Sequence, residues 1–452
     1  MSDSDERKCP YATRRGFLAA AGGLAAAAGS GLAAPAVAAT VEAPKPGATA
    51  RDRPAVEPFF GKHQAGIATP QQTHTYFAAF DLLTRQRGEV IALLQAWTAA
   101  AARMARGQTA QPLEGGLKPV LVSDAAAANN DDAYSAPDPS KSAGDSGEAL
   151  GLPAARLTVT FGFGPGLFSK DGVDRYGLAA RRPEALVDLP KFNGDQLVAA
   201  NTGGDLSVQA CADDPQVAFH AVRQLARVAH GVAQIRWTQT GFLAPSAAGA
   251  TPRNLLGFKD GTQRPAALDQ VVWAGDEAPA WLRNGSYLVV RKIRIALEHW
   301  DQTPVGFQEQ TIGRHKYSGA GIGGKHEFEP LNLAAVDKDG NPVIAENAHV
   351  RLATAASNDG AQILRRGYSY NDGTSVTAER WPPWRQGLEY DAGLLFLCYQ
   401  RDPRAGFVKI FANMAKLDML NQFVTHVGGG LFACPGGVGE GEFVGQRLFA
   451  GA

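Results

Sequence analysis

His349 differs from the other histidines of the chain in the residues that surround it. It lies in the segment Glu-Asn-Ala-His-Val-Arg (residues 346–351), after a Gly/Pro turn, and the pair Arg365-Arg366 follows sixteen positions later. A neutral imidazole can ligate haem iron and leave the opposite face of the haem to a cationic or acidic group. The alternative is a structural histidine, which is the usual role of a single histidine in a sequence. His220, which lies on a predicted helix, is interpreted as structural.

Asp260 belongs to a second conspicuous segment, Asn-Leu-Leu-Gly-Phe-Lys-Asp-Gly-Thr (residues 254–262). An aspartate next to glycine often does no more than shape a turn. A tight loop can also hold a carboxylate in a pocket, where it moves a proton to or from a bound molecule. Spacing alone leaves both interpretations open.

The first half of the chain predicts the elements that would surround such residues. Residues 157–163 alternate between apolar and polar positions as a strand does, and further strands are predicted at 74–83, 205–211 and 232–239. A helix is predicted over 85–106, and a second begins at 213–215, where two aspartates precede Pro215, and continues to residue 230. The order strand, helix, strand, strand, helix, strand is that of the ferredoxin-like unit.

The second half predicts a similar unit. Strands are predicted at 286–297 and 394–400, and a helix over 403–424. We therefore expect an α+β protein of two ferredoxin-like domains with antiparallel sheets, covering residues 58–245 and 246–452. Residues 124–150 are rich in Asn, Asp, Ser and Gly, and are predicted to form a long loop or insertion.

The N-terminus reads as an export signal. Arg14-Arg15 and Phe17-Leu18 precede an Ala/Gly-rich run that ends in Pro35 and small residues, which is the order of a cleavable signal peptide. The paired arginines resemble the twin-arginine signal. We expect a signal peptide at 1–39, a flexible leader at 40–57, and a periplasmic or extracellular mature chain. A transmembrane anchor is the alternative, because the run is long enough to span a bilayer.

The composition excludes several classes of protein. Of 452 residues, 45% are apolar, which is enough to build a core. Lys plus Arg and Asp plus Glu are both 44, and no basic run is present, which argues against a nucleic-acid partner. The four cysteines are too few for a disulfide scaffold. Cys211 and Cys398 lie in apolar runs and are predicted to be core residues.

Residues 257–261 (Gly-Phe-Lys-Asp-Gly) match the GxxDG signature of the dye-decolourising peroxidases. The resemblance covers most of residues 58–445. The other segments that resemble the family are residues 60–67, 160–164, 284–287, 313–319, 349–351 and 364–368. Together with the twin-arginine signal, the resemblance points to the exported deferrochelatase/peroxidase subgroup. The family fold is a pair of ferredoxin-like domains of the dimeric α+β barrel type that bind haem b, which implies one haem in the C-terminal domain here.

The resemblance implies a role for six residues. His349 would be the proximal ligand of the haem iron, and Asp391 the carboxylate that accepts a hydrogen bond from its other ring nitrogen. Asp260 would be the distal acid–base residue and Arg365 the distal arginine, with Arg366 as the neighbouring candidate. Arg351 and Arg314 would pair with the haem propionates, because arginine suits bidentate carboxylate recognition.

The function expected from these roles is reduction of hydrogen peroxide and oxidation of dyes, phenols or other one-electron donors. Because carboxylates titrate in the acid range, activity is expected at acidic pH. The alternatives are a haem-handling protein of iron acquisition with incidental peroxidase activity, and a binding protein without haem. The twin-arginine translocon is the expected partner during export, and no stable membrane anchor is expected in the mature chain. A homodimer or larger homo-oligomer stays open.

Overall fold

The structure is a computed structural model that describes residues 56–113, 143–244, 250–262, 265–378 and 386–450. The predicted signal peptide, nearly all of the predicted leader and most of the predicted 124–150 insertion lie outside the described residues. Within them, no helix is both long and apolar enough to cross a bilayer.

The N-terminal half contains all six predicted elements in the predicted order. They are β1 (His74–Leu82), α1 (Arg87–Met104), β2 (Thr158–Phe163), β3 (Leu206–Ala212), α4 (Pro215–Val228) and β4 (Ala233–Phe242). The strands pair antiparallel in the order β2-β3-β1-β4. Helix α4 begins where predicted because the Asp214 carboxylate accepts the N–H groups of Gln216 and Val217, and Pro215 fits the first turn.

The C-terminal half repeats this arrangement with longer strands. Its strands are β5 (Ser286–Ile295), β7 (Tyr368–Ala378), β8 (Gln386–Gln400) and β9 (Val424–Cys434), with a two-residue strand β6 (Leu364–Arg365) beside β8. These strands pair in the order β9-β5-β8-β7. In both halves the order is therefore fourth, first, third and second strand of that half, since the first half reads β4-β1-β3-β2. The intervening helices are α6 (Leu297–Asp301), α7 (Val305–Ile312), α8 (His349–Leu352) and α9 (Lys409–Leu417). The shorter elements are α3 (Pro165–Phe168), α5 (Leu268–Val271), α10 (Gln446–Phe449), the 3-10 turns Ala179–Arg181, Ala199–Asn201, Ala356–Asn358 and Met419–Gln422, and a π-helical turn at Arg404–Val408.

The predicted helix over 403–424 was wrong in its second part. Helix α9 ends at Leu417, because Asp418 adopts an extended conformation (φ −67°, ψ 122°) and its side chain accepts the N–H of Leu420. A short aspartate side chain that bonds to the backbone competes with helical hydrogen bonding and stops the helix. Strand β9 then begins at Val424.

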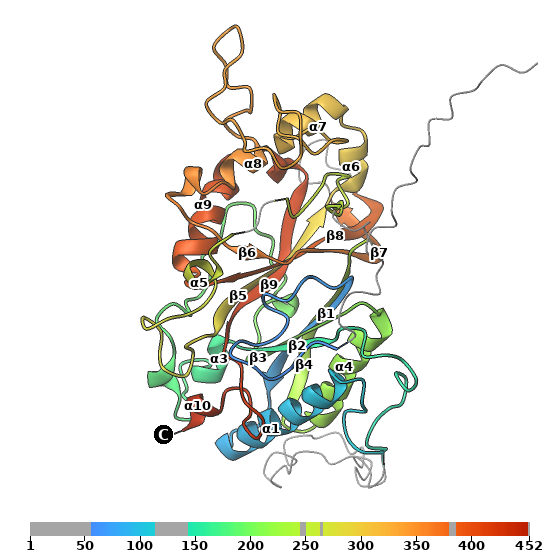
Figure 1. Cartoon of the computed structure of the whole chain (residues 1–452), viewed down its shortest axis with the longest axis vertical. Helices are drawn as coiled ribbons and strands as arrows, with labels where there is room; N and C mark the ends of the chain where they lie inside the picture. The colour runs from blue at the N-terminus through green and yellow to red at the C-terminus, as the bar shows by residue number, and fades with distance from the viewer. Residues whose placement is uncertain (1–55, 114–142, 245–249, 263–264, 379–385, 451–452) are drawn as a thin grey trace, which may run out of the picture. The chain divides into compact units, whose positions relative to one another are not determined.

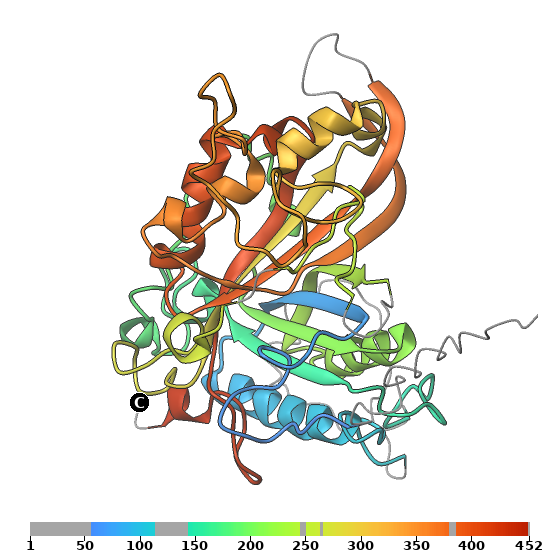
Figure 2. The same ribbon diagram turned by 45° about the horizontal axis from the view of Figure 1, so that its top comes forward.

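The two four-stranded sheets join into one closed ring. Phe163 of β2 pairs with Ala433 of β9, and Phe242 of β4 pairs with Ser369 of β7. Inside the ring lies a core that draws on both halves, and it includes Phe77, Trp237, Leu288, Tyr368, Leu397, Tyr399 and Phe432. Figures 1 and 2 show α1 and α4 beside the strands of the first half, and α6 to α9 gathered over those of the second.

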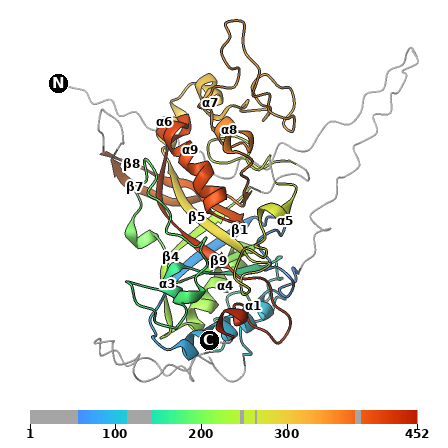
Figure 3. The ribbon, with the colours of Figure 1, turned by 90° about the vertical axis from the view of Figure 1, so that its left-hand side faces the viewer.

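Strand β8 separates two environments because its side chains alternate. Leu395, Leu397 and Tyr399 belong to the core inside the ring. Phe396 and Cys398 point the other way and pack with residues of the outer core, including Phe407 beside α9. The outer face of the C-terminal sheet, beneath α8 and α9 (Figure 3), is the surface on which the candidate site lies. Cys211 and Cys398 are buried, as predicted, and both are free thiols.

Candidate active site

Asp260 is held by a tight loop that its own sequence explains. The Asn254 side chain accepts the N–H groups of Leu256 and Phe258, and the Asp260 N–H is bonded to the carbonyl of Pro252. Gly257 has φ +82°, and a Cβ at this position would lie 2.9 Å from Cε of Lys316. The positive φ therefore favours glycine at this position. With Phe258 buried as an anchor, the Asp260 carboxylate is presented at the surface of the loop, with 26% of its side chain exposed.

Arg365 meets Asp260 from the edge of the C-terminal sheet. Its Nη1 donates to Oδ1 of Asp260 at 3.0 Å. The neighbouring Arg366 points to the opposite side, where it is 3% exposed and donates to the carbonyl of Thr69 and the side chain of Gln72. Of the two adjacent arginines, Arg365 is thus the one that the strand alternation brings to Asp260.

The Asp260–Arg365 pair lines a hollow of about 260 Å³ that is open to solvent. This volume lies just below the roughly 300–1,000 Å³ typical of small-molecule sites. Leu394 and Phe396 of β8 contribute apolar wall, and Ser369 and Tyr368 of β7 complete one side. The hollow therefore combines one acid and two arginines, Arg253 and Arg365, with apolar surface.

His349 lies at the first residue of α8, and its charged partner is Asp418. His349 Nδ1 lies 2.7 Å from Oδ2 of Asp418, whose side chain is 3% exposed. Burial lowers the pKa of His349, but the Asp418 carboxylate outweighs it, so the net pKa is raised. The charges of Arg365 and Asp260 also act on His349, which places the imidazole in the same region as the pair in the hollow.

The prediction that Asp391 is the partner of His349 was wrong. Asp391 lies on β8 with Oδ1 3.4 Å from the Tyr370 hydroxyl and Oδ2 4.0 Å from Lys292 Nζ. It belongs to the same alternating set as Leu395 and Tyr399, so it faces away from α8. Sequence reasoning missed Asp418 because it placed that residue inside a continuous helix. The usable signal was the Lys-Leu-Asp run, in which an aspartate follows the last helical residues and caps the next turn.

Arg351 and Arg314 are both engaged with backbone carbonyls. Arg351 donates to Ile344 and Leu333, and Arg314 donates to Gly319 and Glu327. Arg314 is buried, and burial lowers its pKa, with the nearby Arg365 charge acting in the same direction. These contacts brace the loops between α7 and α8. Pairing of either arginine with a haem propionate stays a prediction.

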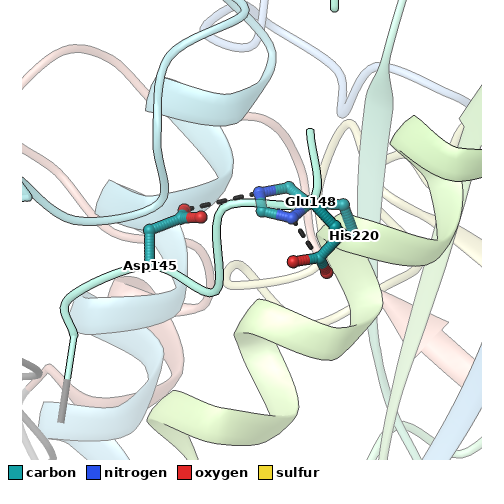
Figure 4. A group of neighbouring side chains, drawn as sticks. All are labelled: Asp145, Glu148 and His220. Atoms are coloured by element: carbon teal, nitrogen blue, oxygen red, sulfur yellow. Dashed lines mark ion pairs between the residues drawn. The ribbon is translucent and has the colours of Figure 1, made fainter. Parts of the chain in front are cut away.

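A second cluster of titratable groups lies in the N-terminal half. Asp145, Glu148 and His220 have potential ligand atoms within 4.8 Å of one another. Figure 4 shows the imidazole between the two carboxylates, with His220 Nε2 3.4 Å from Asp145 and Nδ1 3.1 Å from Glu148. One ring cannot direct both nitrogens at a single ion, and Arg223 Nη1 lies 3.3 Å from Glu148. The arrangement fits a histidine that ties two carboxylates to α4, in agreement with its interpretation as structural.

Family models match most of the described chain. The model "Dyp-type peroxidase, N-terminal" matches residues 64–243, and "Dyp-type peroxidase, C-terminal" matches residues 251–439. The dye-decolorizing peroxidase of Thermobifida fusca is 37% identical, with 100% of both chains covered. The chain belongs to the Dyp-type peroxidase family. It is a haem-dependent peroxidase.

Other Dyp-type relatives agree with this assignment. The deferrochelatase of Escherichia coli K12 is 34% identical over 99% of both chains. A DyP-type peroxidase from Streptomyces coelicolor has a TM-score of 0.74 at 38% identity, covering 88% of this chain and 97% of that one. DtpA from Streptomyces lividans, solved as an oxyferrous complex, has a TM-score of 0.73 at 39% identity, covering 87% of this chain and 97% of DtpA.

The cofactor is haem, and the residues of the candidate site fit it. His349 has its Nδ1 occupied by Asp418, while its side chain remains 30% exposed and its Nε2 makes no hydrogen bond with a described residue. Half-buried Leu394 and Phe396 supply apolar surface, and Arg365 and Asp260 supply charge. A flat apolar macrocycle that needs one imidazole ligand and a polar distal side suits this donor set.

Proposed function

We propose that the C-terminal half of this Dyp-type peroxidase binds haem b through His349 and reduces hydrogen peroxide with Asp260 and Arg365. The observation that carries the proposal is that the C-terminal half holds two pairs of charged side chains, His349 with Asp418 and Asp260 with Arg365. Asp418 holds His349, and Arg365 holds Asp260 at 3.0 Å beside an apolar wall. When bound, haem supplies the iron at which peroxide reacts and the oxidising capacity that follows.

The chain's own residues move the proton and stabilise charge. The Asp260 carboxylate would take a proton from one oxygen of the peroxide and return it to the other oxygen, which would depart as water. The Arg365 guanidinium is permanently charged and lies beside Asp260, so it stabilises the negative charge that develops on the leaving oxygen. We also propose that turnover is fastest at acidic pH.

Asp418 orients the proximal histidine. His349 Nδ1–H donates to the Asp418 carboxylate, which fixes the tautomer and leaves the Nε2 lone pair free, so His349 would hold the haem iron through Nε2. The same carboxylate makes the imidazole a stronger electron donor. Asp418 can perform this role because the Leu420 N–H, which it also accepts, locks its side chain.

The natural reductants are proposed to be aromatic one-electron donors, such as phenols or dyes. This choice is supported by the name of the Thermobifida fusca relative, a dye-decolorizing peroxidase. Release of iron from haem is the second candidate function, supported by the relative in Escherichia coli that is a deferrochelatase.

We also propose export by the twin-arginine translocon, as the N-terminal Arg14-Arg15 sequence indicates. The mature chain would act in the periplasm or outside the cell. Replacement of both arginines by lysine should leave the precursor in the cytoplasm, which cell fractionation would show. A single chain carries all the residues of the proposed site, so a homo-oligomer is not needed for catalysis.

The test of the peroxidase proposal is an absorption spectrum of the haem-reconstituted mature chain before and after one equivalent of hydrogen peroxide. The wild-type Soret band should change on addition of peroxide, His349→Ala should lose the native band, and Asp260→Asn should keep it but respond slowly. A Soret band that ignores peroxide in the wild type would refute the proposal. If Asp260→Asn releases iron from haem at the wild-type rate while its peroxidase turnover is lost, the second function is independent of the first.

A further inference from the structure

Lys259, the residue before Asp260, makes a contact that the proposed chemistry does not use. Lys259 pairs with Arg253 in a short antiparallel bridge, so the loop is extended at this point. Successive side chains of an extended segment point to opposite sides, and of Lys259 and Asp260 only Asp260 lines the hollow. The Lys259 side chain, which is 22% exposed, instead forms an ion pair with Glu327, whose side chain is 9% exposed.

Glu327 is a largely buried carboxylate that keeps its charge. Burial alone would raise its pKa, but the hydrogen bonds from Lys259 and Thr251 and the charge of Arg314 lower the pKa below the usual value. A carboxylate that stays ionised with little solvent around it needs a cation close by. Lys259 supplies that cation, so the two side chains hold each other in place.

The aliphatic stem of Lys259 is held as closely as its ammonium group. It lies against Gly319, where a Cβ would be 2.7 Å from Cδ of Lys259. A single buried guanidinium fixes both residues that contact Lys259, because Arg314 Nη1 donates to the carbonyl of Gly319 at 2.7 Å and to that of Glu327 at 3.0 Å. The partners of Lys259 are thus braced before Lys259 meets them.

These contacts join the distal and proximal sides of the candidate haem site. Gly319 and Glu327 both lie between α7 and α8, in the segment that ends at His349. Arg253, the bridge partner of Lys259, also donates to two backbone carbonyls of this segment. The loop that presents Asp260 therefore rests on the stretch of chain that leads to the proximal histidine.

We propose that the Lys259–Glu327 ion pair positions Asp260 for proton transfer. Lys259 is a positioning residue: it keeps the loop against the α7–α8 segment, so that the Asp260 carboxylate stays beside Arg365 and at a set place relative to His349. A displacement of about 1 Å at a reacting group can cost about 10²-fold in rate, so a loop released from this contact loses catalysis without losing a reacting group. This inference rests on the peroxidase function proposed above, because the pair acts through Asp260.

The experiment compares Lys259→Met with the conservative Lys259→Arg. In the haem-loaded chain, stopped-flow mixing with peroxide should show the rate of the Soret change lowered about 10–100-fold in Lys259→Met, with the same amount of haem bound. Lys259→Arg keeps the charge and should recover most of the rate. In the haem-free chain, hydrogen exchange at the Asp260 N–H, which the Pro252 carbonyl accepts in the wild type, should become faster in Lys259→Met.

Lys170→Met is the matched control in the N-terminal half. Lys170 lies 2.9 Å from Asp81 and 3.2 Å from the buried Asp205, so this variant also takes a lysine from a buried carboxylate. It should lower the free energy of unfolding in urea but leave the Soret rate and the exchange at Asp260 as in the wild type. Glu327→Gln removes the other partner without stranding a buried carboxylate, so it should reproduce the loss of rate even if Lys259→Met does not fold.

The Asp260→Asn background decides whether the pair acts through Asp260. Adding Lys259→Met to Asp260→Asn should change the remaining rate by less than about twofold, because no carboxylate is left to position. A further tenfold loss in that background, an equal loss of rate in Lys170→Met, or wild-type rate and exchange in Lys259→Met would each overturn the positioning role. No Soret change in the wild type would instead refute the peroxidase function, and the exchange measurement on the haem-free chain would still decide whether Lys259 holds the loop.

Discussion

Replacement of Asp418 by asparagine tests the proximal side of the site. Asparagine has nearly the same shape, and its side-chain oxygen can still accept the Leu420 N–H, so the turn after α9 should form. The variant removes the negative charge 2.7 Å from His349 Nδ1. A charge-assisted hydrogen bond then becomes a neutral one, or is lost if the amide presents its NH₂ group.

The expected loss is in haem affinity. Removal of the carboxylate partner of a metal-ligating histidine typically weakens metal binding by about 10–100-fold. Since each factor of ten equals about 1.4 kcal/mol, the expected change is about 1.4–2.8 kcal/mol. The measurement is haem release to an excess of a haem-scavenging globin, followed at the Soret band. Urea unfolding of the haem-free chain would check that stability is retained.

Asp391→Asn is the matched control, because it makes the same chemical change on β8, on the face of the sheet that points away from α8. Asp391 contacts Tyr370 and Lys292, so its replacement should leave haem release within about twofold of the wild type. The reasoning would be refuted if Asp418→Asn retained haem as tightly as the wild type. It would equally be refuted if Asp391→Asn weakened haem binding as much as Asp418→Asn did.

Three further predictions concern the distal pair and two buried histidines. Asp260→Asn should lower kcat/KM for peroxide by about 10²–10⁴-fold with haem still bound, and Arg365→Leu by about 10²–10³-fold; unchanged stopped-flow rates would exclude these roles. Burial, and then the charge of Arg291, lower the pKa of His426 from 6.5 to about 3, so below pH 6.5 the unfolded chain binds a proton that the folded chain refuses. The free energy of unfolding should therefore fall as the pH drops from 6.5 toward 3, and His426→Asn should remove about 4 kcal/mol of this loss. Urea unfolding at several pH values in this range measures it. A variant whose unfolding free energy changes with pH as much as that of the wild type would contradict this. His220→Ala leaves Asp145 and Glu148 without their shared partner and should cost about 3–5 kcal/mol of unfolding free energy, with haem release unchanged; a loss below 1 kcal/mol would mean that the cluster contributes little.

The helices and strands that the sequence predicted well have strong local signals. Helix α4 has an aspartate cap, a proline in its first turn and an apolar stripe, so its start was predicted correctly. The GxxDG loop was recognised because residues 257–261 are contiguous and match the family signature. In each case the interactions that decide the structure lie within a few residues of one another.

Long-range contacts account for the errors. The choice between Asp391 and Asp418 depends on which face of β8 an aspartate occupies and on where α9 stops, and His349 and Asp418 are 69 residues apart. Similarly, the pairings of β2 with β9 and of β4 with β7, which close the ring of strands, join residues of different halves. No local sequence pattern predicts them.

The sequence by itself determined the order of elements in the first half and the loop that presents Asp260. It also named His349 and Arg365, whose motifs are continuous in the chain. Only the tertiary structure decided that Asp418 holds His349, that Arg365 rather than Arg366 meets Asp260, and that Asp391 faces Tyr370. The physical reason is that these partners are chosen by strand alternation, sheet register and the end of a helix, which bring together side chains that are far apart in the sequence.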